Sequence, residues 1–113
     1  MKNVKREAAF QKTVIQMAQL HGWKVAHFRP ARTKDGGWLT PVAANGKGFP
    51  DLMCVRQKTR QRFAAELKIP PNTLTPEQDE WLDAMEISGI PAYVWTPADW
   101  IEIERVLRDG PEA

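Results

Sequence analysis

The sequence predicts a mixed α/β sandwich in which a small sheet is flanked by helices, with the element order α-β-β-β-α-β-α. Apolar residues recur at helical spacing near the N-terminus, and Arg62–Ile69 alternates in the manner of a half-buried strand. Two Thr-Pro pairs, at Thr75 and Thr96, are typical of helix starts in the second half of the chain. With 113 residues, the chain is expected to form a single domain.

The N-terminal part predicts one helix, one strand and a long loop. The helix is expected over Val4–Leu20, because Gly22 stands where a C-terminal cap belongs. Trp23–Phe28 alternates as a strand does. Between Arg29 and Gly48 the periodicity is lost and Gly and Pro recur, so a long structureless loop is expected, with a role in substrate contact. Trp38 in this loop is a candidate for stacking on a base, or else packs over the loop.

The central part predicts a hairpin. A short apolar strand is expected over Asp51–Val55, and the polar run Gln57–Gln61 is expected to form the turn. In the returning strand, Arg62–Ile69, the apolar residues share one face and the polar residues Glu66 and Lys68 share the other. Two consecutive prolines then stop the strand, because proline cannot donate to a ladder. The first three strands are expected to form an antiparallel meander.

The C-terminal part predicts a crossover helix, a fourth strand and a last helix. Thr75 is expected to cap the crossover helix, with Gln78 three residues later completing a capping box, and the helix should run to Gly89. Ala92–Trp95 is expected to be the fourth strand, and the last helix should cover Pro97–Arg108. Because the connection between strands three and four contains a helix, these two strands should be parallel.

The composition excludes several classes of protein. The single Cys54 cannot form an internal disulfide, and its apolar neighbours favour a small buried hydrophobe over a reactive thiol. His21 and His27 have no partner at a zinc-binding spacing and are expected to be ordinary core or surface residues. No stretch approaches the roughly 20 apolar residues that span a bilayer, and the N-terminus lacks the apolar run of a signal peptide. A cytosolic protein with no membrane partner is expected.

The charge distribution is more informative than the formal net charge of +2. Basic residues gather between positions 24 and 47 and in the second hairpin, whereas acids gather from Glu77 to Glu104. One basic end and one acidic end would suit contact with phosphates, although an ordinary solvated surface accounts for the same charges. The basic residues concerned are Lys24, Arg29, Arg32, Lys34 and Lys47, followed by Arg56, Lys58, Arg60 and Arg62.

Asp51, Glu66 and Lys68 form the candidate catalytic core. Hairpin pairing should bring Asp51, at the start of one strand, toward Glu66 near the end of the next. Two carboxylates can bind a hard cation such as Mg²⁺, which activates water for phosphodiester hydrolysis, and a neighbouring lysine can orient that water or offset charge. Taken separately, Glu66 and Lys68 are better explained as a solvated cross-strand ion pair, and Asp51 as a turn residue, and only their combination favours the catalytic interpretation.

Several short motifs follow one another along the chain, namely Glu7 with Phe10-Gln11, Gly22-Trp23, Gly48-Phe49-Pro50-Asp51, Glu66-Leu67-Lys68, Leu74-Thr75-Pro76-Glu77-Gln78, and Tyr93-Val94-Trp95 before Trp100. Their order and spacing resemble the VRR-type nuclease domain (VRR-NUC) of the PD-(D/E)XK nuclease superfamily, especially its small stand-alone phage and bacterial members. The likeness extends over about residues 5–107. The stretch 33–45 departs from it, since it is longer than the usual connection.

The resemblance implies a restriction-endonuclease-like fold and assigns ligands for Mg²⁺ or Mn²⁺. Asp51 and Glu66 would bind the metal together with the carbonyl of Leu67. Glu7 would reach the same region from the first helix. Without the resemblance, Glu7 is explained as well by a first-turn acid that the helix dipole favours.

The resemblance also assigns the residues around the metal. Lys68 would activate the water or stabilise charge, and Gln78 would support the site from the second helix. Gln78 already has a structural explanation as part of the capping box, and the two roles are compatible.

These assignments imply a metal-dependent endonuclease that cuts DNA and that could be specific for branched or Holliday-junction DNA. Because one site cuts one strand, cleavage of both strands would need a homodimer. A phage origin would place the protein in the host cytoplasm. Two alternatives stay open, namely a catalytically inactive DNA-binding module on a nuclease-like scaffold and a small α/β interaction protein.

Overall fold

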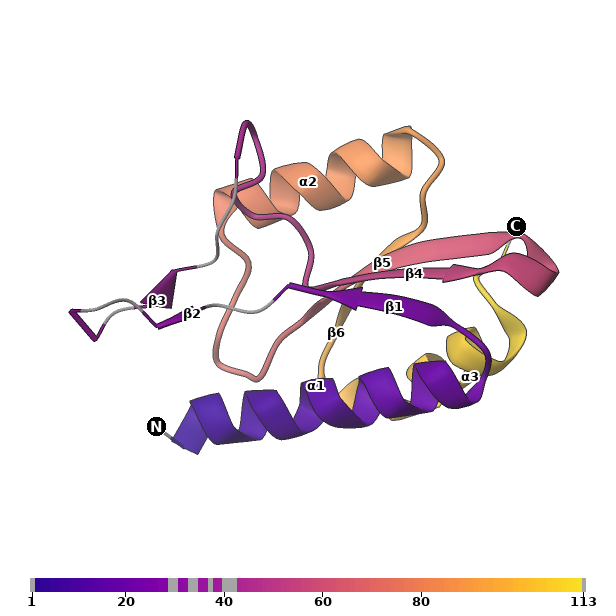
Figure 1. Cartoon of the computed structure of the whole chain (residues 1–113), viewed down its shortest axis with the longest axis horizontal. Coiled ribbons are helices and arrows are strands. Elements are labelled where there is room, and N and C mark those ends of the chain that lie inside the picture. The colour runs from indigo at the N-terminus through magenta and orange to yellow at the C-terminus, as the bar shows by residue number, and fades with distance from the viewer. Residues whose placement is uncertain (1, 29–30, 33–34, 37, 40–42, 113) are drawn as a thin grey trace.

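The computed structural model describes residues 2–28, 31–32, 35–36, 38–39 and 43–112, with side chains for 5–28, 35–36 and 43–112. A four-stranded sheet lies between two helical layers, with α1 (Lys2–Leu20) and α3 (Trp100–Asp109) on one face and α2 (Pro76–Ile87) on the other (Figure 1). The predicted α/β class is therefore confirmed, and the arrangement is consistent with a restriction-endonuclease-like fold.

The main sheet has the strand order β1-β4-β5-β6. These strands are β1 (Lys24–His27), β4 (Leu52–Arg56), β5 (Gln61–Leu67) and β6 (Ala92–Trp95). The pairs β1·β4 and β4·β5 are antiparallel, and β5·β6 is parallel, as the meander and the crossover helix predicted. The predicted third strand ends too late, at Ile69. The ladder stops at Leu67, although the Lys68 amide still donates to the Trp95 carbonyl at 2.9 Å.

The helices are α1 (Lys2–Leu20), α2 (Pro76–Ile87) and α3 (Trp100–Asp109). The last helix was predicted to begin at Pro97, but Pro97–Asp99 is a 3₁₀ turn that leads into α3. Thr96 caps this turn, since its hydroxyl accepts from the Ala98 amide at 3.3 Å. Across the described part of the chain, none of the helices combines the length and apolarity that crossing a membrane requires.

The expectation of a structureless loop from Arg29 to Gly48 is wrong. Two short strands, β2 (Ala31–Arg32) and β3 (Trp38–Leu39), pair antiparallel within it. Such pairing satisfies backbone groups that a purely irregular loop would leave to water. The side chain of Trp38, proposed to stack on a base, lies outside the described residues, as do residues 33–34, 37 and 40–42 of the predicted insertion.

The core lies between the sheet and the α1–α3 layer. Phe10, Val14 and Ala18 of α1 pack with Ile103, Val106 and Leu107 of α3 against the apolar face of β4 and β5. Cys54 is fully buried in this cluster, as expected of a small hydrophobe, and burial raises the pKa of its thiol to about 12.

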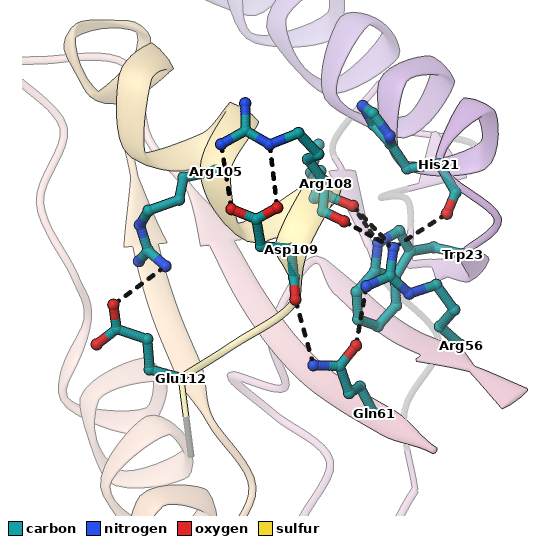
Figure 2. Close-up of polar contacts among 9 residues, drawn as sticks. His21, Trp23, Arg56, Gln61, Arg105, Arg108, Asp109 and Glu112 are labelled. Atoms are coloured by element: carbon teal, nitrogen blue, oxygen red, sulfur yellow. Dashed lines mark hydrogen bonds and ion pairs between the residues drawn. The ribbon is translucent and has the colours of Figure 1, made fainter. Parts of the chain in front are cut away.

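Arg56 belongs to the structural framework and not to a phosphate-binding surface, which corrects the assignment of this residue from sequence. Only 9% of it is exposed, and its Nη1 donates to the carbonyls of His21, Leu107 and Arg108, each at 3.2 Å (Figure 2). Its guanidinium also lies over the Trp23 ring, 4.5 Å from the centroid. A cation is favoured here because helices α1 and α3 both end at this point and leave carbonyls unpaired.

Candidate functional site

Asp51 and Glu66 meet at the end of the sheet where β4 begins and β5 ends. The register pairs Leu52 with Ala65, so continuing it by one residue sets Asp51 opposite Glu66. The Asp51 carboxylate also accepts a hydrogen bond from the Leu67 amide at 2.9 Å. The Leu67 amide lies beyond the last residue pair of the β4·β5 ladder, Leu52 and Ala65, and its bond to Asp51 fixes that side chain between the two strands.

Glu66 is held in place by Lys68 and Gln78. The Lys68 ammonium lies 3.6 Å from Glu66 Oε2, and the side chains are only 15% and 3% exposed. Gln78 Nε2 donates to the same Oε2 at 3.2 Å, while Gln78 Oε1 accepts from the Thr75 amide at 2.9 Å. Gln78 therefore serves the capping box and the carboxylate at once, because its amide has a donor and an acceptor end.

The other oxygen of Glu66 is buried without a partner among the described residues. A buried carboxylate oxygen without a hydrogen bond is costly, so either a proton or a cation is needed to neutralise it. Burial, and then the negative charge of Asp51, raise the pKa of Glu66 to about 8. Burial also raises the pKa of Asp51, against the opposing effect of the Leu67 amide. In the absence of a cation, the pair therefore holds a proton at neutral pH.

Glu7 and His27 lie at the border of this site. Burial raises the pKa of Glu7, and the charge of Asp51 raises it further, whereas Lys68 lowers it. The electrostatic interaction with His27 lowers the pKa of Asp51, as the smallest of the effects on that carboxyl. Because α1 begins at Lys2, Glu7 is beyond the first turn, and the explanation of Glu7 as a first-turn acid is wrong.

His27 is a residue that the sequence reasoning missed. It was assigned an ordinary core or surface place, yet strand pairing sets it opposite Leu52, next to Asp51. The register of β1 and β4 depends on how a long intervening loop closes, and no local pattern in the sequence reports this.

The donors at the site fit a hard divalent cation. Mg²⁺ commonly takes one or two protein carboxylates and fills its other positions with water and substrate phosphate. Asp51 and Glu66 offer two such carboxylates, one with an unpartnered oxygen. In the described part of the chain, no group of three or more His, Cys, Asp or Glu side chains is placed to enclose a metal.

The expectation of one basic end is wrong. The hairpin that carries Lys58, Arg60 and Arg62 lies at the opposite end of β4 and β5 from Asp51, whereas the loop before β4 lies near it (Figure 1). A chain that folds back on itself separates groups that are close in sequence, so clustering along the sequence did not report clustering in space.

Comparisons with known proteins place the chain in a family. A family model for the VRR-NUC domain matches residues 33–99, which is more than half of the 113-residue chain. The match includes Asp51, Glu66, Lys68 and Gln78 but not Glu7. Searches of curated proteins and of solved structures each returned no match. The chain belongs to the VRR-NUC domain family, and its function is of the nuclease type.

Proposed function

We propose that the protein is an endonuclease that hydrolyses DNA phosphodiester bonds with a Mg²⁺ or Mn²⁺ ion bound by Asp51 and Glu66. The observation that carries this proposal is the buried Glu66 oxygen without a partner beside a second carboxylate. In the metal-free protein a hydrogen bond between the two carboxyl groups raises the pKa of Glu66 and lowers that of Asp51, and a divalent cation would take the place of the proton that they share.

Two further ligands complete the proposed metal site. In an extended residue the N–H and C=O point to the same side, so the Leu67 carbonyl is directed toward the side on which its amide meets Asp51. Glu7 lies on α1, close enough to the site that the charges of Asp51 and Lys68 shift its pKa. It would bind the metal directly or through water.

When bound, the cation would lower the pKa of an attacking water and neutralise charge that develops on the phosphate. Lys68 is held beside Glu66 and would orient that water, or its charge would stabilise the five-coordinate phosphorus in the transition state. Gln78 would keep Glu66 Oε2 in place, which leaves Oε1 for the metal. Lys68 is thus the proposed catalytic residue and Gln78 a positioning residue.

A cleavage screen would test the proposal. Supercoiled plasmid, linear duplex, flap and four-way-junction DNA would each be incubated with EDTA, Mg²⁺ or Mn²⁺. We expect cutting only with a metal, with a preference for branched DNA, and calorimetry should show Mn²⁺ binding that Glu66→Gln abolishes. Binding of DNA without cutting under every condition would instead support an inactive DNA-binding module. Neither metal nor DNA binding would support an interaction protein.

We also propose that two copies act together on double-stranded or branched substrates. One site offers one set of carboxylates and therefore cuts one strand at a time. Light scattering with and without junction DNA should show a dimer at least in the complex. A monomer that nicks paired strands independently would contradict this part of the proposal.

A further inference from the structure

A groove runs between α1 and the edge strand β1. It has a volume of about 320 Å³ and is lined by Ala8, Gln11, Lys12, Gln16 and His27, among others. One end of the groove lies near the candidate site, because His27 lines the groove and the strand register sets it opposite Leu52, the residue after Asp51. A ligand in this groove would therefore continue directly into the site.

Charge differs sharply between helices α1 and α2. Helix α1 carries four basic residues and one acid, Glu7, whereas α2 carries five acids and no basic residue. The two helices cover opposite faces of the sheet (Figure 1). A polyanion that approaches the site from the α1 side is attracted, and one that approaches from the α2 side is repelled. The acids of α2 are Glu77, Asp79, Glu80, Asp83 and Glu86.

A second groove lies on the α2 side of the molecule. It has a volume of about 410 Å³, and Glu77 and Glu80 line it. Its one lysine, Lys47, forms an ion pair with Glu77 at 3.5 Å. For a phosphate chain, charge outweighs volume here, so this groove is the poorer candidate.

We infer that the groove between α1 and β1 holds the sugar–phosphate backbone of the DNA strand that is cut, on one side of the scissile bond. This inference rests on the proposed function. Lys12 would contact a phosphate, and the amides of Gln11 and Gln16 can donate to phosphate oxygens. Ala8, a small residue, leaves room for the backbone to come close to the helix. Lys5 lies seven residues before Lys12, on the same face of α1, and extends the basic stripe.

A charge reversal with a matched control tests this placement. Lys12→Glu and Lys58→Glu both change an exposed lysine by the same charge, but Lys58 lies at the far end of the sheet. Affinity for a short labelled DNA, measured in EDTA by fluorescence anisotropy, should fall about tenfold for Lys12→Glu and less than about twofold for Lys58→Glu. The salt dependence of the binding constant should also lose about one unit of slope only in Lys12→Glu.

A gain of affinity provides a test that misfolding cannot imitate. Gln16→Lys adds a cation to the groove, and Gln57→Lys adds one at the opposite end of the sheet. We expect the former to bind DNA about threefold to tenfold more tightly and the latter to resemble the parent. Equal effects at both ends in either pair would overturn the inference. Because DNA binding is measured without metal, it does not depend on cleavage. A failure to cut DNA would therefore overturn the proposed function, while the binding data would still test the placement of DNA in the groove.

Discussion

Two buried charged side chains lie at opposite ends of the same hairpin, and they differ in how completely they are satisfied. At one end, Arg56 uses each of its three nitrogens. Its Nε donates to the Thr59 hydroxyl at 3.0 Å, Nη1 donates to three carbonyls, and Nη2 donates to Gln61 at 2.8 Å. Figure 2 shows the contact with Gln61. At the other end, one oxygen of Glu66 has no partner within the described ranges. A burial fraction alone would not separate the two residues, as both are nearly inaccessible to solvent.

The difference separates a structural charge from a functional one. The partners of Arg56 are protein groups that unpaired helix ends supply, so its burial stabilises the fold. Glu66 sits beside another carboxylate with too few donors, so its burial in the metal-free protein is unfavourable. Unfavourable burial of this kind is expected where a ligand completes the site.

The largest effect is expected from a substitution at the end of the hairpin that carries Asp51 and Glu66. Asp51→Asn should reduce DNA cleavage with Mn²⁺ by at least about a thousandfold, which corresponds to about 4 kcal/mol of activation free energy. Asparagine can still accept from the Leu67 amide, so the urea midpoint should change little. Asp79→Asn, at an exposed position of α2, is the control and should cut as the parent does. An active Asp51→Asn enzyme would show that the site lies elsewhere.

The next largest effect is expected from a substitution at the other end of the hairpin, which carries Arg56. Arg56→Ala should lower the free energy of unfolding by about 3 kcal/mol, because it removes the donor to the His21 and Arg108 carbonyls and one of the two donors to the Leu107 carbonyl. Urea denaturation would measure this change, with Lys58→Ala as an exposed control expected within about 0.5 kcal/mol of the parent. Mn²⁺ affinity below the unfolding transition should not change. A large loss of metal affinity in Arg56→Ala would mean that the two ends are coupled.

The pH dependence of stability sharpens the contrast. Between about pH 5 and pH 8, Glu66 stays protonated in the folded metal-free protein but ionises in the unfolded chain. The folded state then binds more protons, so the free energy of unfolding should fall as the pH rises through this window. We expect a fall of about 2 kcal/mol in the free energy of unfolding by pH 8, because relaxation of the protein around the charge reduces the cost of burying it. Glu66→Gln should remove this fall.

Thermal denaturation in EDTA at several pH values would test this expectation. Glu80→Gln, on the exposed surface of α2, is the matched control and should retain the pH dependence of the parent. Adding Mn²⁺ at pH 8 should stabilise the parent but not Glu66→Gln. A pH profile that Glu66→Gln leaves unchanged would contradict the raised pKa.

The smallest effect divides the two roles of Gln78. Gln78→Ala and Thr75→Ala each break the capping box and should each lower stability by about 1 kcal/mol. Only Gln78→Ala also removes the donor to Glu66, so only this variant should lower kcat, by about tenfold. Equal kcat values for the two variants would limit Gln78 to its capping role.

Several features of this protein could be predicted from sequence because they depend on local geometry. The alternation of side chains along a strand sets Glu66 and Lys68 on one face, and the structure places their charged groups 3.6 Å apart. The capping box of Thr75 and Gln78 depends on four consecutive residues. The hairpin turn is short, so the approach of Asp51 to Glu66 was also within reach of a sequence argument.

Only the tertiary structure decided the features that depend on packing between distant segments. Sequence counted Arg56 with its exposed basic neighbours, because nothing local shows that two helices end beside it. The place of His27 next to Asp51 depends on a register set across a long loop. Chain reversal likewise sets Lys24 at the hairpin end, where Val55 lies between it and Arg62, and leaves Lys47 in the loop before β4 at the other end. Local interactions thus determined the helices and strands and the pairing of Asp51 with Glu66. Long-range packing decided that Arg56 has protein hydrogen-bond partners and that Glu66 lies in a buried place with few donors.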